Sequence, residues 1–371
     1  MKKILILYTS VGLGHKYIAL NIGKHLENAG YTVKLEDVLQ LQSGSLVSFS
    51  TWLHGFVNRR LPFVWRWLYF SQLVTRIGLM FRLKVARSHS QHVKNIVDEF
   101  SPDMVITTQT TATAAMVSLK ERGFYSGQLG VGFSDYHFHR LWFYKQADFY
   151  LVNIPEQKEA LIKLGYPEEQ IVICGITLEQ KRDADLIALR NEYKIPAENK
   201  IVLFGVGSLG IGFDTTLLFE FLNLTSEFKE ITVVVFCGKN TELYKLLKQQ
   251  RFENVIALPF IDNIKDWYQA ADLFITKPGG LTVAESLQAG LKILVTHTLP
   301  GQEEPNYDYL LSHDLIFPKP NKLNAQSLKA VMLKALQSPK LEFNQTSQLL
   351  TQFGEEGKTL VNKVNNQFHK V

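Results

Sequence analysis

Short apolar runs, many of them β-branched, alternate along the chain with stretches whose apolar positions recur at helical spacing. This alternation is typical of parallel sheets covered by helices. The predicted strands form two groups of five: residues 3–9, 31–38, 103–109, 129–135 and 148–153, then residues 200–207, 231–238, 255–260, 272–277 and 292–297. Helices are predicted at about 15–29, with Gly30 as the C-terminal cap, and at 264–271 and 281–290.

Each group of strands makes a complete α/β unit, so the pattern predicts two Rossmann-like domains. The length of 371 residues agrees with two domains. A charged stretch between Gly175 and Asn199 separates them, and we predict an N-terminal domain at 1–175 and a C-terminal domain at 176–345. Residues 346–371 are expected to form a C-terminal helix that packs back toward the N-terminal domain. Two such domains facing one another place a ligand cleft between their strand ends.

The composition changes this picture little. Apolar residues make up 46% of the chain and charged residues 20%, and the net charge of +5 argues only weakly for an anionic partner. Cys174 and Cys237 each precede a glycine and are interpreted as small buried side chains in a reducing, cytoplasmic setting. We find neither a signal peptide nor an apolar run of about 18 residues, so no membrane span is expected.

The charges are unevenly distributed, because residues 38–97 contain eight basic residues and no acid. Within this stretch, apolar residues form one stripe on a predicted helix, at Phe63, Trp67, Phe70, Val74, Ile77 and Phe81. Such a stripe is usually buried. Trp65, Leu68, Tyr69 and Leu79 lie off the stripe, however, and arginines without partners are costly to bury. We therefore predict that this segment binds a membrane interface through Arg59, Arg60, Trp65, Arg66, Trp67, Arg76 and Arg82.

Three glycine loops follow predicted strands and open helices: SVGLGH at 10–15, GVGSLG at 205–210 and KPGGLT at 277–282. Amides at a helix N-terminus bind phosphate, although tight turns alone also explain such glycines. The second loop is a complete G-x-G-x-x-G, but the next strand ends in Gly238 and Lys239 instead of the acid that a dinucleotide enzyme needs. Glu285, three residues after Thr282, is placed to accept two ribose hydroxyls.

Residues 259–306 resemble the donor half of the GT-B glycosyltransferases and are similar in particular to glycosyltransferase family 28. That family includes the lipid-linked N-acetylglucosaminyltransferase of peptidoglycan synthesis and the monogalactosyl- and glucosyl-diacylglycerol synthases. SVGLGH and LGYPEEQIVICGI resemble other motifs of the family, and GVGFSDYHFHRLWFYKQADFYLVN resembles its diacylglycerol branch. The resemblance implies an α/β fold of the GT-B type, with two Rossmann-like domains facing across an interdomain cleft. The chain departs from the family in its less glycine-rich GVGSLG and in Ser134, where threonine is usual.

The resemblance also implies roles for individual residues. His15 would be the general base, a task that suits a side chain with a pKa near 6.5, and Asp135 is our candidate for its orienting partner. A solvent-facing, non-catalytic His15 is the alternative. The residues implied to bind the donor, from diphosphate and ribose to uracil and hexose, are Gly12, Gly14, Gly207, Ser208, Phe260, Ile261, Gly279, Gly280, Leu281, Thr282, Glu285, Gln302, Glu303 and Asn306. His137 and His139 have no third ligand at suitable spacing nearby and are interpreted as acceptor-side or structural residues. The resemblance implies that the active site needs no metal.

The resemblance, together with the basic aromatic residues 59–82, predicts an inverting hexosyltransferase that moves glucose or galactose from a UDP-sugar to diacylglycerol, a 1,2-diacylglycerol 3-beta-glycosyltransferase that makes a β-glycolipid. The expected partners are UDP-glucose or UDP-galactose, diacylglycerol and anionic membrane lipids, with no cofactor and no nucleic acid. The expected location is peripheral, or monotopic, on the inner face of the cell membrane. Three alternatives stay open: a peptidoglycan-type N-acetylglucosaminyltransferase, a UDP-sugar 2-epimerase, and a non-catalytic membrane scaffold that senses UDP-sugar.

Overall fold

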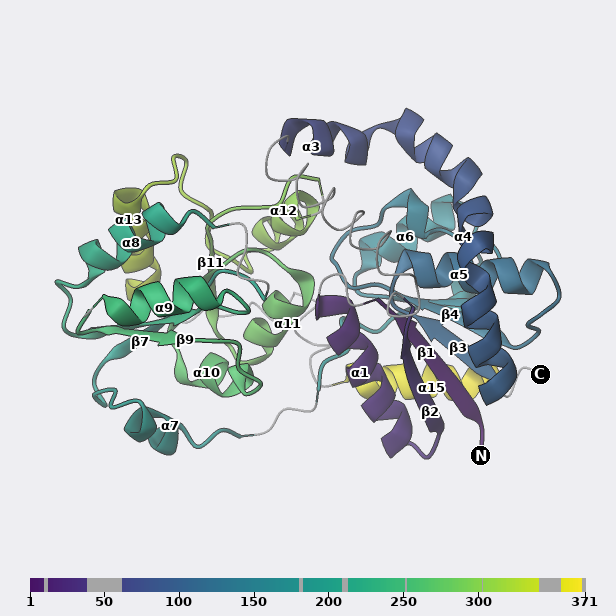
Figure 1. The fold of residues 1–371 in the computed structure, drawn as a ribbon, viewed down its shortest axis with the longest axis horizontal. Helices are drawn as coiled ribbons and strands as arrows, with labels where there is room; N and C mark the ends of the chain where they lie inside the picture. Colours follow the sequence, from purple (N-terminus) through teal and green to yellow (C-terminus); the bar gives the residue numbers. More distant parts are fainter. Residues whose placement is uncertain are drawn as a thin grey trace. The chain divides into compact units, whose positions relative to one another are not determined.

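The computed structural model describes residues 1–9, 13–38, 62–179, 183–208, 213–250, 252–301, 303–339 and 355–368. The chain forms two compact units (Figure 1). Unit 1 comprises Met1–Gln180, Pro300–Gln302 and Thr351–Val371, and unit 2 comprises Lys181–Leu299 and Glu303–Leu350. The division after Gln180 falls within the charged stretch 175–199 of the sequence.

Unit 1 contains a six-stranded parallel sheet with the order β2-β1-β3-β4-β5-β6. Its strands are β1 (Lys3–Tyr8), β2 (Thr32–Asp37), β3 (Met104–Thr107), β4 (Gln128–Gly132), β5 (Phe149–Val152) and β6 (Ile171–Ile173). The inner strands β3 and β5 are buried along their whole length, as is usual where helices cover both faces of a parallel sheet.

Helices surround this sheet: α1 (Leu13–Asn28), α3 (Pro62–Phe70), α4 (Gln72–Phe100), α5 (Thr110–Glu121), α6 (Pro155–Lys163), α15 (Glu356–Phe368) and the short 3-10 helices η1 (Arg140–Trp142) and η2 (Glu168–Gln170). The C-terminal helix α15 packs on α1, so the end of the chain belongs to unit 1. Gly357 allows the close approach, because a Cβ there would lie 2.2 Å from the His25 ring. Tyr31 also donates a hydrogen bond to Asn365 of α15.

The predicted apolar helix between residues 63 and 81 is two helices, α3 and α4, which meet at Ser71. Ser71 has extended backbone angles, and its hydroxyl accepts a hydrogen bond from the amide of Val74. Serine is a favoured N-cap because its side chain satisfies an amide at the start of the helix. The cap therefore ends α3 and starts α4 as a separate helix.

Unit 2 contains a five-stranded parallel sheet with the order β11-β10-β7-β8-β9. Its strands are β7 (Lys200–Gly205), β8 (Ile231–Phe236), β9 (Val255–Leu258), β10 (Leu273–Thr276) and β11 (Lys292–Val295). Its helices are α7 (Leu186–Glu192), α8 (Thr215–Thr225), α9 (Thr241–Gln249), α10 (Ile264–Ala270), α11 (Gly280–Gln288), α12 (Glu304–Ser312) and α13 (Ala325–Gln337).

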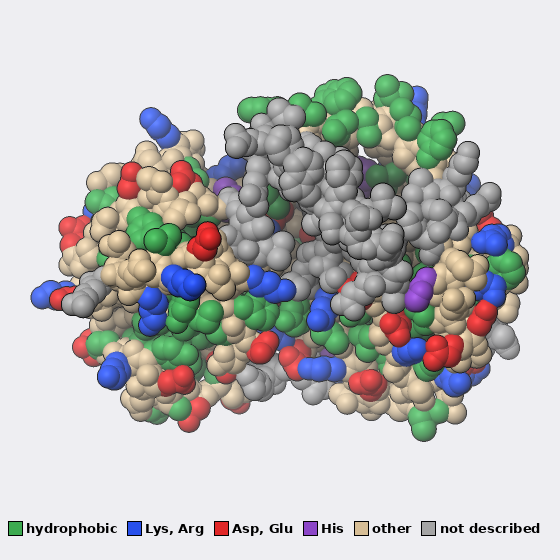
Figure 2. All heavy atoms as spheres, viewed as in Figure 1, with side chains coloured by type: hydrophobic (Ala, Val, Ile, Leu, Met, Phe, Trp, Pro, Cys, Tyr) green, Lys and Arg blue, Asp and Glu red, His purple; other side chains and the backbone are tan. Residues whose placement is uncertain are grey.

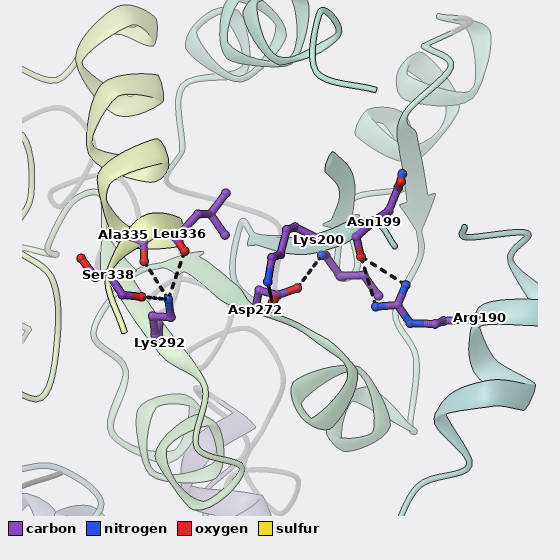
Figure 3. Close-up of polar contacts among 9 residues, drawn as sticks. Arg190, Asn199, Lys200, Asp272, Lys292, Ala335, Leu336 and Ser338 are labelled. Atoms are coloured by element: carbon purple, nitrogen blue, oxygen red, sulfur yellow. Dashed lines mark hydrogen bonds and ion pairs between the residues drawn. The ribbon is translucent and has the colours of Figure 1, made fainter. Parts of the chain in front are cut away.

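Polar side chains form hydrogen bonds and an ion pair at the N-terminal ends of the unit 2 strands (Figure 3). Lys292, the first residue of β11, is buried and donates to the carbonyl oxygens of Ala335 and Ser338 at 2.8 and 2.7 Å. A lysine there satisfies the carbonyls that α13 leaves open at its C-terminus. Beside it, Lys200 Nζ lies 3.0 Å from Asp272 Oδ1.

All ten predicted strands are present in the structure, and each contains fewer residues than the range predicted for it. One further strand among the described residues, β6, was not predicted. Its three residues lie directly after η2, and so short a run carries too little periodicity to be read from sequence.

Candidate functional site

The strand order of unit 2 reverses between β7 and β10, which are neighbours in the sheet although β8 follows β7 along the chain. Ligands of open α/β sheets bind outside the carboxyl ends of the strands at such a point. Two of the three glycine loops begin there, at Gly207 after β7 and at Gly279 after β10. The fold therefore brings together two loops that lie about 70 positions apart in the sequence.

Gly238, after β8, shapes the first of these loops. It has a positive φ of 56°, and a Cβ there would lie 2.5 Å from the carbonyl oxygen of Gly207 and 2.6 Å from that of Ser208. The Lys239 amide donates to Ser208 O at 3.0 Å. Only glycine permits this approach. The residue that argued against a dinucleotide enzyme in the sequence therefore supports the Gly207–Ser208 turn, and it leaves the Ser208 side chain exposed.

Helix α11 starts at the second loop, and no side-chain hydrogen bond caps its N-terminus. Gly279 is its N-cap and offers no side chain to the first amides, and Gly280, Leu281 and Thr282 follow in the first turn. Such an N-terminus favours an anion. Glu285 lies one turn further, with a side chain only 12% exposed and Oε1 3.4 Å from Lys265 Nζ. This geometry suits a diphosphate beside a carboxylate.

Lys277 is a residue of this region that the sequence reasoning missed. It directly follows β10, and its ammonium group pairs with Oε1 of Glu303, whose side chain is 7% exposed. The other carboxylate oxygen of Glu303 accepts from the Leu299 amide at 2.9 Å. Both oxygens of Glu303 thus bind protein groups in this structure, and its contact with a hexose stays a prediction.

Asn306 is completely buried and donates from Nδ2 to Pro278 O at 3.2 Å. It thereby holds the loop that precedes α11. Phe260 is 38% exposed after β9, with Lys239 Nζ 6.0 Å from its ring centroid, and Ile261 packs against the core of unit 2. Gln302 lies outside the described residues.

His297, after β11, was also missed by the sequence reasoning. Its Nδ1 lies 2.8 Å from Thr296 Oγ1, and its buried Nε2 has no hydrogen-bond partner among the described residues. Burial lowers the pKa of His297, and the charge of Glu303 opposes that shift. His297 and Glu303 are brought together by the fold at the carboxyl ends of the strands. No sequence motif links them, so the sequence could not mark this histidine.

In unit 1 the strand order reverses between β1 and β3, and His15 lies at that point in the first turn of α1. Thr108, directly after β3, donates its hydroxyl to His15 O at 3.2 Å. The imidazole is partly buried, with its centroid 5.9 Å from that of the Trp142 ring. Gly14 has open space around it, and Gly12 lies outside the described residues.

Burial lowers the pKa of His15, while the charge of Asp135 acts in the opposite direction. A lowered pKa keeps the imidazole neutral at neutral pH, which is the form that accepts a proton. The Nδ1 atom of His15 is buried and has no hydrogen-bond partner within the described ranges. Asp135 acts on the ring through its charge, and its Oδ2 accepts from Ser134 Oγ at 3.0 Å.

The backbone around Asp135 is held from the sheet side by two buried amides. Asn153 Nδ2 and Gln157 Nε2 both donate to Asp135 O, at 2.9 and 2.8 Å, and Gln157 also donates to His137 O at 2.8 Å. Buried amides that use several donors in this way fix a loop strongly. The segment after β4 therefore has a defined path toward His15.

The helix α3 contacts the same segment. Tyr69 Oη lies 2.7 Å from His137 Nε2, and His139 Nε2 lies 3.1 Å from Tyr69 O. The Leu141 amide donates to His139 Nδ1, which assigns the ring proton of a neutral His139 to Nε2. Through these contacts with Tyr69, His137 and His139 hold α3 against the segment that follows β4.

Most of the stripe predicted on α3 and α4 faces outward. Phe63, Trp67, Phe70, Ile77 and Phe81 are exposed, Phe63 by 84% and Trp67 by 62%, whereas Val74 of the stripe and the off-stripe residues Trp65, Leu68, Tyr69 and Leu79 are partly buried. Hydrophobic side chains accordingly gather over α3 and the first half of α4 (Figure 2). A contiguous apolar surface of this kind marks an interaction site.

The basic residues of this region are placed differently from one another. Arg66 and Arg76 are exposed, and Arg59 and Arg60 lie outside the described residues. Arg82 faces the protein: Nη1 donates to Leu141 O at 3.0 Å, and the guanidinium lies 3.9 Å from the centroid of the Tyr144 ring. Arg82 therefore interacts with an aromatic ring and a carbonyl oxygen, since residues 38–97 contain no acidic partner for it.

Two structural features are absent from the described residues. They contain no group of three or more histidine, cysteine, aspartate or glutamate side chains that could hold a metal ion. None of their helices is long and apolar enough to cross a membrane.

The whole chain is similar in fold to solved GT-B enzymes. The glycosyltransferase of kitacinnamycin matches with a TM-score of 0.66 and 14% identity, covering 99% of each chain. A putative UDP-N-acetylglucosamine 2-epimerase from Listeria monocytogenes matches with a TM-score of 0.62 and 13% identity, covering 100% of this chain and 98% of its own. The fold class is therefore GT-B, as predicted, and the fold alone does not separate transferase from isomerase.

Sequence families narrow the class. Residues 17–178 match the model of monogalactosyldiacylglycerol (MGDG) synthase, and residues 201–306 match the glycosyltransferase family 28 C-terminal domain. Together the two models match most of the chain, which confirms the resemblance to glycosyltransferase family 28 found in its motifs.

Relatives with an assigned name agree with this family. A processive diacylglycerol beta-glucosyltransferase from Bacillus licheniformis is 27% identical over 387 residues, covering 98% of this chain and 97% of its own. A protein of the same name from Staphylococcus carnosus is 28% identical over 225 residues, covering 59% of this chain and 56% of its own.

Proposed function

We propose that this glycosyltransferase moves glucose or galactose from a UDP-sugar to diacylglycerol, with inversion at the anomeric carbon. One observation carries the acceptor part of the proposal: the exposed apolar helices α3 and α4 belong to the same unit as His15 and contact the segment of Asp135. A lipid acceptor reaches its enzyme from an apolar phase, which exposed aromatic side chains suit. The names of the relatives support the same acceptor.

In the proposed mechanism His15 takes the proton of the acceptor hydroxyl while its oxygen attacks the anomeric carbon. The bond from that carbon to the diphosphate breaks, and UDP leaves. General base catalysis of this kind contributes about 10²- to 10⁴-fold. In unit 2 we propose that Thr282 and the first amides of α11 receive the charge of the leaving diphosphate, and that Glu285 binds the ribose. Oriented amides would then stabilise the leaving group without a metal ion.

The place of action follows from the same features. We propose that the protein is peripheral on the inner face of the cell membrane, where its UDP-sugar is available on the cytoplasmic side. The exposed side chains of α3 and α4 would enter the interface, and Arg66 and Arg76 would meet anionic headgroups.

The test is transfer by the purified full-length chain from UDP-glucose or UDP-galactose to diacylglycerol in liposomes of phosphatidylglycerol and phosphatidylcholine. We expect a glycosyl-diacylglycerol with the β configuration, detected by mass spectrometry and NMR. Competition between the two donors in one reaction identifies the sugar. Failure to form glycolipid with every UDP-hexose would refute the proposal, and formation of an epimerised UDP-sugar in place of glycolipid would favour the isomerase.

The base is tested separately with His15→Ala. This variant should lose at least about 10²-fold in turnover while its affinity for UDP stays unchanged, because Thr282 and Glu285, proposed to bind the diphosphate and ribose, belong to unit 2 and His15 to unit 1. A variant that keeps its turnover would show that another group accepts the proton.

A further inference from the structure

The outer surface of α3 and the segment around Asp135 are connected through Tyr69. The outward residues Phe63 and Trp67 are exposed, while Tyr69 lies partly buried on the inward side of the same helix. Its hydroxyl bonds His137, and its backbone oxygen bonds His139. The ring of Tyr69 also packs against the His139 ring, with 4.7 Å between the centroids. One residue of α3 therefore makes three contacts with the segment.

The start of α4 holds the other end of the same segment. Arg82 donates to Leu141 O, and Gly78 packs against the Leu141 side chain. A Cβ on Gly78 would lie 3.1 Å from Leu141 Cδ2, so the small residue lets α4 approach closely. Both exposed apolar helices thus have their inward sides on residues 135–144.

Residues 135–144 reach His15 at their inward side. The charge of Asp135 acts on the His15 imidazole and also on Tyr69, and the Trp142 ring lies near the His15 ring. The segment thus lies between the exposed helices and the histidine, and these contacts form one continuous chain within unit 1.

We infer that Tyr69 is a positioning residue that couples docking of α3 and α4 on a lipid bilayer to the arrangement of residues 135–144 beside His15. The inference rests on the proposed function for its catalytic consequence. A helix whose outer side chains lie in an apolar phase has fewer orientations available than one in water, and the hydrogen bond from Tyr69 to His137 passes that restriction to the segment. A single hydrogen bond changes such an equilibrium about two- to tenfold.

Hydrogen exchange of the full-length chain tests the coupling without any turnover. Liposomes of phosphatidylglycerol and phosphatidylcholine should slow exchange of the amides in residues 135–144 of the wild type. Tyr69→Phe keeps the ring and removes only the hydroxyl, so it should float with the liposomes as the wild type does. Its gain in protection at 135–144 should be about two- to tenfold smaller.

Three further variants make the result specific. His137→Gln retains an amide that can bond the Tyr69 hydroxyl and should keep the protection, whereas His137→Leu should lose it as Tyr69→Phe does. The matched control is Tyr31→Phe, which removes a tyrosine hydroxyl that bonds Asn365 in the same unit. Its protection at 135–144 should equal that of the wild type.

Turnover gives the second measurement. With diacylglycerol in liposomes, Tyr69→Phe should lower kcat about two- to tenfold and leave the KM for the UDP-sugar within about twofold. Equal protection at 135–144 with and without liposomes, or an equal gain in wild type and Tyr69→Phe, would overturn the inference. A wild type that shows coupled protection but transfers no hexose would refute the proposed function alone, and the coupling would stand.

Discussion

Removal of the Lys277 ammonium group should destabilise unit 2 strongly, because it isolates a buried charge. Glu303 has a side chain that is only 7% exposed, and its two oxygens are bound by Lys277 and by the Leu299 amide. In the variant Lys277→Met the carboxylate keeps only the amide. A buried carboxylate loses its hydration on folding, and with one partner removed the remaining hydrogen bond offsets only part of that free-energy cost.

The magnitude follows from the burial of the two partners. Breaking a buried ion pair by removing one member costs about 3–5 kcal/mol. Lys277 is itself 27% exposed and the Leu299 amide remains, so we expect the lower end of that range, about 3 kcal/mol. The second variant, Lys277→Met with Glu303→Gln, removes both charges and should recover more than half of the loss.

Native-state hydrogen exchange of the β10 amides in the full-length chain measures this loss, since β10 lies directly before Lys277. The matched control is Lys200→Met. Lys200 pairs with Asp272 at 3.0 Å in the same unit, but its side chain is 56% exposed, so the loss should be about 0.2–1 kcal/mol. The reasoning is wrong if Lys277→Met costs no more than Lys200→Met, or if the double variant is less stable than the single one.

Three other predictions concern the base, the lipid surface and the strand edge. Asp135→Asn should lower turnover and move the acid limb of the pH profile of kcat/KM to lower pH. The reason is that the Asp135 carboxylate raises the pKa of His15, so its loss lets that pKa fall. An acid limb that moves to higher pH would contradict this. Replacing Arg59, Arg60 and Arg66 by glutamine should weaken flotation with anionic liposomes more than with neutral ones, whereas Phe63→Ser with Trp67→Ser should weaken both; equal loss on both for the arginine variant would remove these residues from the lipid site. Lys292→Met should destabilise unit 2 by about 1–3 kcal/mol in urea unfolding, because the carbonyls of Ala335 and Ser338 lose their donor; an unchanged midpoint would show that water replaces it.

The order of elements was readable from the sequence because it depends on local patterns. Several apolar runs of both sheets are buried on both faces, and runs such as residues 231–236 stand out from their polar neighbours. The loops at Gly207 and Gly279 were readable for a similar reason, since a turn from strand to helix requires particular residues at fixed offsets. The break at Ser71 was not read, because a continuous apolar period outweighs one serine.

The partners of the site residues could not be read in the same way. Lys277 pairs with Glu303 and Tyr69 with His137, across separations of 26 and 68 positions. Nothing in either local pattern distinguishes these residues from other lysines and tyrosines. Asn306, expected among the hexose contacts, is buried against Pro278 O, and that burial depends on how α12 packs beside the loop.

Residues 63–81, in α3 and α4, show most clearly what the sequence determines and what the tertiary structure decides. The sequence by itself determined that residues 63–81 form helix with an apolar stripe, because helical periodicity is a local property of the chain. The sequence also predicted contact with a membrane interface, but only the tertiary structure decided which side chains face outward, that Tyr69 faces inward, and that Arg82 stacks on Tyr144. A stripe has the same pattern whichever side it faces, and the side is fixed by the residues across the fold that occupy the other face.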